Sequence, residues 1–183
     1  TSVTIPDSVT TIGNAIFGGC SNLTEFNGKF ASEDGRCLIV DDTLMSFAIG
    51  CGATEYVIPP SVTVIGNYAF YECSSLQSVY IEDLVKWFAI DFKDSDSNPL
   101  YYTADLYLNG EKVTDFTFPA GTTEIGTQLR GCTSLVSVTI PDSVTSIGYD
   151  AFRYCSSLRC VIFGGTSEQW GNISIGSSNS SLN

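Results

Sequence analysis

Two kinds of side chain dominate the groups in this chain that could do chemistry: carboxylates and thiols. The 183 residues include no histidine, so the commonest general base and every Ser-His or Cys-His nucleophile arrangement are absent. The neighbouring carboxylates Asp41-Asp42 and Glu82-Asp83 could support glycosidase chemistry, which needs two carboxylates facing one bond. Neighbours on a strand point to opposite faces, however, and such pairs are typical of turns. The sequence therefore predicts no catalytic residues and no enzyme.

One acidic segment resembles the start of a calcium-binding loop. Asp94, Asp96 and Asn98 alternate along it, and Asp105 falls at the twelfth position of such a loop. Pro99, however, occupies the place where the loop needs glycine for its sharp turn. We expect a solvated loop here, with calcium as the alternative, and we assign neither a metal nor a cofactor to the chain.

The cysteines predict a structural role. Their number is seven, so they cannot all pair within the chain. Cys20, Cys73, Cys132 and Cys155 each follow the same motif, which predicts a ladder of buried free thiols that behave as small hydrophobic groups. Cys132 and Cys155 fall on adjacent repeats and could oxidise. Zinc sites use closer pairs of cysteines than Cys155 and Cys160, so we expect none.

The charge balance excludes two classes of partner. The chain carries 20 acidic and 8 basic residues, for a net charge of −12. Nucleic acids and anionic membrane surfaces need a basic face, and no apolar run is long enough to insert into a membrane. The chain has neither an initiator methionine nor a signal-peptide pattern, and it opens in the middle of a repeat. We therefore expect it to be part of a longer protein.

An internal repeat organises the whole sequence. The segment 3–13 returns at 138–148 with a single substitution, and further copies begin at Ile58 and Phe118. After each Ile-Gly of the motif comes a short apolar run and a cysteine. The copies that contain Pro119 and Pro141 lie 22 residues apart, within the range of leucine-rich repeats. The longer intervals must contain inserted or degenerate coils.

Each part of the unit predicts a local structure. Leu135, Val138 and Ile140 have the spacing of inward positions on a short strand, and the proline that follows ends it. The β-branched Ser-Val-Thr-x-Ile-Gly stretch predicts a second short strand on the other side of the coil. The x-x-Ala-Phe-x-x-Cys stretch predicts one helical or 3₁₀ turn. Phe118 begins the most divergent copy, which is a residue short and lacks the Ala-Phe pair.

A single coil cannot bury its apolar side, so successive coils must stack around one core. The predicted fold is a right-handed leucine-rich-repeat solenoid, mainly β, with short helical or 3₁₀ turns and β-hairpin inserts. Phe17, Phe70 and Phe152 should point inward at equivalent depth. We expect bare repeats near 1–23, 55–78, 113–135 and 136–158, inserts near 24–54 and 79–112, and a partial repeat over 159–183.

The inserts carry hairpin signals. Asp34-Gly35 lies within the segment 30–44, and Asn109-Gly110 follows a Leu-Tyr-Leu strand pattern. The second pair should connect that strand to the next coil. The C-terminal segment 164–183 is rich in glycine, serine and asparagine, and we expect it to be loosely held.

The I-P-x-S-V-T-x-I-G-x-x-A-F-x-x-C unit resembles the BspA-like leucine-rich-repeat family of bacterial surface proteins. The resemblance covers essentially the whole chain. It implies a curved solenoid on secreted or surface-anchored proteins of host-associated microbes, some of which act as adhesins for host matrix proteins or other cells. An extracellular or cell-surface location follows from it. The family has no shared ligand-binding motif, so the resemblance assigns no site residue.

Recognition by such a fold would use strand positions that face solvent along the inner curve. Register places the following residues there: Ser2, Thr4, Glu25, Asn27, Glu55, Val57, Ser78, Tyr80, Asp115, Thr117, Ser137, Thr139 and Ile162. The alternative is that these are only solvated strand positions. The insert aromatics Trp87, Phe88, Tyr101 and Tyr102 are a second candidate surface, although Trp87 recurs at Trp170, which favours a packing role.

Three functions remain open from the sequence. The leading prediction is a non-enzymatic, adhesin-like module that binds a protein ligand, such as a host matrix or cell-surface protein. The second is a passive stalk that displays another domain. The third is a carbohydrate-binding module that uses exposed aromatic side chains.

Overall fold

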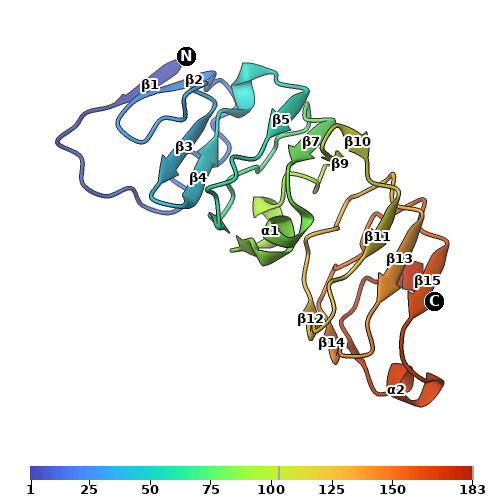
Figure 1. Cartoon of the computed structure of the whole chain (residues 1–183). Helices are drawn as coiled ribbons and strands as arrows, with labels where there is room; N and C mark the ends of the chain where they lie inside the picture. Colours follow the sequence, from blue (N-terminus) through green and yellow to red (C-terminus); the bar gives the residue numbers. More distant parts are fainter. Residues whose placement is uncertain (103, 183) are drawn as a thin grey trace.

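The structure is a computed structural model that describes residues 1–102 and 104–182. The chain winds as a solenoid in which longer strands follow one another on one side, and two-residue strands together with the hairpin over 37–47 lie on another (Figure 1). In Figure 1 the longer strands run from the blue N-terminal end at the upper left to the red C-terminal end at the lower right.

The elements are short throughout. In chain order they are β1 (Ser2–Ile5), β2 (Glu25–Gly28), β3 (Cys37–Val40), β4 (Thr43–Phe47), η1 (Ile49–Cys51), β5 (Glu55–Val57), β6 (Val64–Ile65), β7 (Ser78–Ile81), α1 (Leu84–Ala89), β8 (Asp91–Phe92), η2 (Ser95–Ser97), β9 (Asp105–Leu108), β10 (Glu111–Lys112), β11 (Asp115–Thr117), β12 (Glu124–Ile125), β13 (Ser137–Ile140), β14 (Ser146–Ile147), β15 (Cys160–Phe163), α2 (Ser167–Gly171), β16 (Ser174–Ile175) and η3 (Ser180–Leu182).

Parallel pairing between successive coils builds the solenoid. On the side of the longer strands, β1 pairs with β2, β5 with β7 and then β9, and β11 with β13 and then β15. On the other side, β4, β6 and β8 form one parallel run, and β12, β14 and β16 form another. The predicted mainly-β solenoid is confirmed. Both sequence stretches named as inserts also contribute parallel strands: β2 and β4 lie in the first, and β8 and β9 lie in the second.

The predicted second strand forms in most coils. It is present as β6, β12 and β14, where the Thr-x-Ile part of the motif pairs with the next coil. In the first copy the equivalent residues 8–13 form no strand. A short strand needs a neighbouring strand to pair with. The strand that would pair with residues 8–13 is β4, and its edge on that side is already paired with β3 in the hairpin.

The predicted helical or 3₁₀ turn after Ile-Gly is present as separate turns with hydrogen bonds from residue i+3 to residue i, and no continuous helix forms in this stretch. The Ala-Phe-x-x-Cys stretch consists of consecutive hydrogen-bonded turns; for example, Cys73 N–H donates to Phe70 O at 3.1 Å. Tyr68 and Glu72 adopt left-handed conformations, with φ of 56° and 61°. A left-handed residue ends helical hydrogen bonding, so the chain turns inward at the phenylalanine without forming a helix.

The second hairpin signal is confirmed. β9 and β10 pair antiparallel, and the turn between them is Asn109-Gly110. Both turn residues have positive φ, 49° and 85°, as a two-residue hairpin turn requires. The hairpin leads directly into β11 of the next coil.

The first insert contains a hairpin whose tight turn lies at Asp41-Asp42 rather than at Asp34-Gly35. β3 and β4 pair antiparallel on either side of Asp41, whose φ is 54°. Asp34-Gly35 makes an earlier turn, which brings Ala31 into an antiparallel bridge with Leu38.

One hydrophobic core runs through most of the solenoid. Phe70 and Phe152 are fully buried in it, as predicted, and so are Cys73 and Cys155. The first coil differs: Phe17 is only half-buried, against Phe26 with ring centroids 5.2 Å apart, and it belongs to a smaller separate cluster. The prediction of equal depth for the three phenylalanines is therefore wrong for the first copy.

The divergent coil contains a buried charge. Arg130, which is 2% exposed, lies 2.9 Å from Asp150, which is 1% exposed. The Arg130 guanidinium also covers the Tyr101 ring, 4.0 Å from its centroid. Asp150 bridges to Arg153 of its own coil at 3.2 Å. The coil that lacks the Ala-Phe pair is thus joined to its neighbours by an ion pair and a cation–π contact.

The C-terminal segment is held in place, contrary to prediction. It forms α2 and β16, and Asn179 is buried at 5% exposure. The Asn179 side chain accepts a hydrogen bond from Phe152 N–H at 2.9 Å and donates to Gly148 O and Gly176 O at 2.9 and 2.8 Å. Two of these hydrogen bonds, with Phe152 and Gly148, attach the polar segment to the coil before it, and the third, with Gly176, lies within the segment.

Candidate binding surface

The exposed side of the longer strands presents two rows of side chains. On each strand the apolar residues turn inward and alternate residues turn outward, because side chains alternate across a strand. We call this surface the strand face. The first row contains Ser2, Glu25, Glu55, Ser78, Asp105, Asp115, Ser137 and Cys160. The second row contains Thr4, Asn27, Val57, Tyr80, Tyr107, Thr117, Thr139 and Ile162.

All the strand residues predicted to face solvent are exposed or half-buried. Glu25, Glu55, Val57, Asp115 and Thr117 are exposed. A further four are half-buried: Asn27, Ser78, Tyr80 and Thr139. The strand register brings them into two rows on one face, but exposure alone does not assign a ligand to any of them.

The central part of the strand face is the most distinctive. Tyr80 of β7 and Tyr107 of β9 align in register, and their rings stack with centroids 4.8 Å apart and planes 25° apart. Val57 precedes them in the same row and is 53% exposed. Both rings are half-buried, and adjacent, partly accessible aromatic rings are the kind of side chain that dominates binding energy at protein interfaces.

The sequence reasoning missed Tyr107 and Asp105. Both lie in a segment that was assigned to an insert hairpin, so their place beside β7 was not foreseen. The Leu-Tyr-Leu alternation was a usable signal, because it places Tyr107 outward between two inward leucines.

An ion pair fixes the edge of the tyrosine stack. Lys112 Nζ lies 2.6 Å from Asp105 Oδ2, and its ammonium group stands 5.6 Å from the centroid of the Tyr107 ring. Thr133 Oγ1 donates to Asp105 Oδ1 at 3.0 Å. Burial by itself would raise the pKa of Asp105, but the hydrogen bonds from Lys112 and Thr133 outweigh it and hold that pKa below its ordinary value. The carboxylate therefore stays charged.

The outer parts of the strand face are smaller and more polar. The hydroxyl group of Ser137 donates to Asp115, and that hydrogen bond lowers the pKa of the carboxyl. Thr117, Thr139 and Ile162 align across three successive strands beside them. Short side chains of this kind offer contact area but little depth for an anchoring group.

The alternative aromatic surface is largely used for packing. Trp87 is 1% exposed, and its indole N–H donates to Gln128 O at 3.1 Å. Phe88 stacks on Phe116 with centroids 4.4 Å apart. The expectation that Trp87 packs α1 onto the solenoid is confirmed. Burial raises the pKa of Tyr102, whose hydroxyl oxygen accepts a hydrogen bond from the Glu72 N–H.

The paired carboxylates have structural roles. Asp83 caps α1 and accepts hydrogen bonds from Val85 N–H at 2.8 Å and Lys86 N–H at 3.2 Å. Asp42 follows the turn of the first hairpin and accepts a hydrogen bond from the Thr63 hydroxyl. Turn and cap formation accounts for both pairs, as the spacing predicted.

The residues of the calcium-like segment are engaged separately. Asp94 accepts hydrogen bonds from Asn67 Nδ2 at 3.0 Å and from Tyr68 N–H at 3.1 Å. Asn98 is buried and accepts from Leu100 N–H at 2.8 Å. In residues 1–102 and 104–182, no three His, Cys, Asp or Glu side chains are grouped as metal ligands would be.

The cysteine ladder is confirmed in part. Cys73, Cys132 and Cys155 are buried, and burial raises the pKa of Cys73 and of Cys155 to about 12. Cys20 is exposed, so the prediction of a buried thiol is wrong at that position. Each of the seven thiols is free, including the neighbouring Cys132 and Cys155.

The repeat can now be assigned to a family. The model of the BspA-type leucine-rich repeat region matches residues 1–34, 44–91 and 103–181, as six copies. The chain belongs to the BspA-type leucine-rich repeat family. Repeats of this type generally serve as non-catalytic scaffolds and interaction modules. A comparison with curated proteins found no match.

Solved structures share the fold at low sequence identity. A leucine-rich cell surface protein from Faecalibacterium prausnitzii aligns with a TM-score of 0.61 at 22% identity, over 95% of this chain and 50% of its own. The pneumococcal vaccine antigen PcpA aligns with a TM-score of 0.51 at 17% identity, over 96% of this chain and 55% of its own. The chain thus spans about half the length of the structures it matches. In the part of the chain that the structure describes, the helices are too short to cross a membrane.

Proposed function

We propose that this chain is a non-enzymatic binding module of a cell-surface protein, and that it holds a protein ligand on its strand face. The stacked pair Tyr80–Tyr107 carries the proposal. Half-buried tyrosines on strands can anchor a partner at small entropic cost, since their positions are already fixed before binding. Val57 extends the anchor along the same row.

The charge of the module selects the kind of ligand. The net charge of −12 and the acidic first row, with Glu55 and Asp105 beside the tyrosines, favour a partner with a basic surface. Basic host matrix or cell-surface proteins fit this requirement. The descriptions of two structural relatives as a cell surface protein and a vaccine antigen support an extracellular location.

The test is binding of the intact chain to purified extracellular-matrix proteins and to a glycan array. We expect capture of at least one matrix protein, and we expect Tyr80→Ala with Tyr107→Ala to weaken it by about tenfold or more, as for interface anchors. Tyr149→Ala is the matched control, because Tyr149 is 57% exposed and lies outside the two rows of the strand face.

Two results would overturn the proposal. No capture of any matrix protein would favour the passive stalk. Capture that the paired tyrosine substitution leaves unchanged would place the binding surface elsewhere. Binding to glycans alone, lost on removal of the tyrosines, would instead support the carbohydrate-binding function.

A further inference from the structure

The strand face is interrupted between β2 and β5. Among the described residues β2 pairs with β1 alone, whereas β5 is the outermost strand of the sheet that continues through β7 and β9. The loop before β3 lies in the gap, attached to the β2 side, because Phe26 N–H donates to Gly35 O at 2.7 Å. One edge of β5 is therefore left without a paired strand.

The hydrogen-bond pattern shows which residues of β5 face the gap. Ser78 N–H donates to Thr54 O at 3.1 Å, and Ile58 N–H donates to Tyr80 O at 3.0 Å. In a parallel ladder, successive residues of a strand turn their N–H and C=O groups to opposite edges. These two bonds therefore turn the backbone groups of Tyr56 toward β7.

The backbone groups of Glu55 and Val57 consequently face the gap. Within the described residues, one hydrogen bond reaches this edge: the Arg36 guanidinium donates to Glu55 O at a long 3.4 Å. Val57 is 53% exposed, and among the described residues its N–H and C=O groups make no hydrogen bond outside the ladder with β7. Unpaired edges of this kind are templates for another strand.

A groove runs along the unpaired edge. Two adjoining hollows, of about 340 and 430 Å³, share Asp34, Tyr56 and Val57 in their walls. The first extends onto the strand face as far as Tyr80, and the second extends past the end of β5 to Pro59. The groove thus follows β5 over its whole length and opens beside the tyrosine stack.

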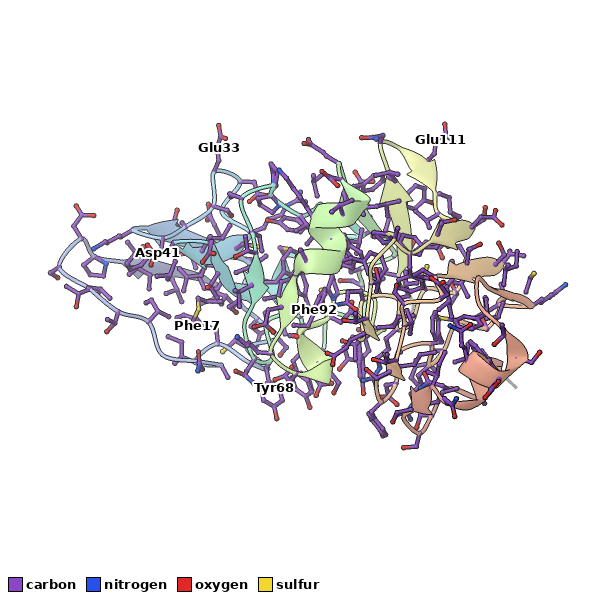
Figure 2. All side chains as sticks on the ribbon, turned by 60° about the horizontal axis from the view of Figure 1, so that its bottom comes forward. Phe17, Glu33, Asp41, Tyr68, Phe92 and Glu111 are labelled. Carbon is purple, nitrogen blue, oxygen red and sulfur yellow. The ribbon has the colours of Figure 1, made fainter. Side chains whose placement is uncertain are left out.

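The groove is acidic. Glu33, Asp34 and Glu55 line it, and its cationic group, Arg36, already lies 3.9 Å from Asp34. Figure 2 shows the Glu33 side chain projecting outward from the loop before β3. An occupant that carries lysine or arginine would be favoured, and an acidic one would be repelled.

We propose that β5 accepts an extended basic peptide segment of the protein ligand as an added strand. The backbone of the segment pairs with the free groups of Glu55 and Val57. A lysine or arginine of the segment lies beside Glu55 and Asp34, and the next side chain on the same face packs against Val57 and Tyr80. Main-chain bonds then supply affinity, and alternate side chains supply specificity.

This inference rests on the proposed function of the strand face and adds the mode of binding. The probe is a short fluorescein-labelled peptide of repeating Lys-Ser-Val-Ser, which places lysine and valine by turns on one face of the extended chain. It is titrated with the intact chain and followed by fluorescence anisotropy. We expect it to bind, and we expect the counterpart with glutamate for lysine not to bind. Binding of both peptides with equal affinity, or of neither, would overturn the inference.

Backbone pairing is tested by two N-methylated versions of the lysine–valine peptide, methylated at odd or at even positions. They block opposite edges of the extended peptide, so we expect one to bind at least about tenfold more weakly and the other to keep its affinity. Equal effects of the two methylation patterns would show that no strand is added.

The matched substitutions are Val57→Pro and Thr117→Pro. Thr117 occupies the same register position on β11, where Ser137 N–H donates to Thr114 O and Phe118 N–H donates to Thr139 O. Each proline removes an N–H that points away from the neighbouring strand, a place where proline is tolerated. We expect Val57→Pro to abolish peptide binding and Thr117→Pro to preserve it, with folding checked by circular dichroism.

If Val57→Pro does not fold, Glu55→Lys tests the same edge through an exposed side chain, and unchanged binding of the lysine–valine peptide would overturn the inference. If matrix-protein capture depends on Tyr80 but the peptide does not bind, the inference of an added strand is overturned. The proposed function of the strand face would still stand. Self-association in sedimentation velocity that Glu55→Lys abolishes would identify the occupant as a second copy of this chain, which also overturns the inference.

Discussion

The segments 3–13 and 138–148 have almost the same sequence but lie in different surroundings. In the later copy, Ile147 and Phe152 are buried at 1% and 0% exposure, whereas Ile12 and Phe17 of the first copy are half-buried. The later coil lies between β11 and β15, while the first coil, as described, has β2 on one side alone. In a solenoid the burial of a residue is therefore decided by neighbouring coils, and the motif supplies only the capacity to be buried.

The largest expected effect concerns the equivalent residues Phe152 and Phe17. Truncating each to alanine should lower the free energy of unfolding by very different amounts. Phe152→Ala should lower the free energy of unfolding by about 3–5 kcal/mol, because it leaves a cavity in a closed core. Phe17→Ala should cost about 1 kcal/mol, since the side chain is half-exposed and its site can collapse. Urea denaturation of both variants measures the difference. Equal losses would mean that the first coil is as tightly packed as the later one.

The last coil should depend on a single polar anchor. Asn179→Ala removes three hydrogen bonds of a buried amide, and we expect a loss of about 1–3 kcal/mol together with faster amide exchange in α2 and β16. Asn172→Ala, at an exposed position, is the control and should change neither quantity. Unchanged exchange in the Asn179 variant would show that apolar contacts alone hold this segment.

The two tryptophans extend the comparison to the helices. Trp87 is 1% exposed, whereas Trp170 is partly exposed with its ring centroid 5.3 Å from that of Phe163. We expect acrylamide to quench the fluorescence of the Trp87→Phe variant, which retains Trp170, much more strongly than that of Trp170→Phe. Stability should fall by about 1 kcal/mol in Trp87→Phe, which loses the indole hydrogen bond, and little in Trp170→Phe. Similar quenching in both variants would contradict the difference in burial.

The effect that is smallest at neutral pH comes from the thiols. The pKa of Cys73 and Cys155 is raised to about 12, so the folded state keeps them neutral, whereas an unfolded thiol ionises near its ordinary value. Their contribution to stability is complete below pH of about 9 and is lost as the pH rises toward 12. Above pH of about 9 the urea midpoint of the unaltered chain should therefore fall as the pH rises. In the double variant Cys73→Ala/Cys155→Ala the midpoint should fall less over the same pH range. The exposed Cys20 should react with a thiol reagent without denaturant, and Cys73 should not.

The sequence predicted the repeat architecture because its evidence is local. Alternating apolar residues, a proline after the strand, and Asn109-Gly110 each act through nearby backbone geometry, and each gave the structure that is observed. The exposed positions of the strand face followed from the same alternation. Tyr107 and Asp105 were missed because a degenerate coil lacks the motif that marks the others.

Long-range packing decided the structural features that the repeat motif does not encode. The depths of Phe17 and Cys20 depend on neighbouring coils, and the ordered C-terminal segment depends on Asn179 reaching back to the coil before it. The groove beside β5 likewise arises where the loop before β3 interrupts the strand face between β2 and β5. The sequence by itself determined which residues face inward or outward within each coil, since that is set by strand periodicity. Tertiary structure alone decided which of them are covered, because burial requires a second surface that lies far away along the chain.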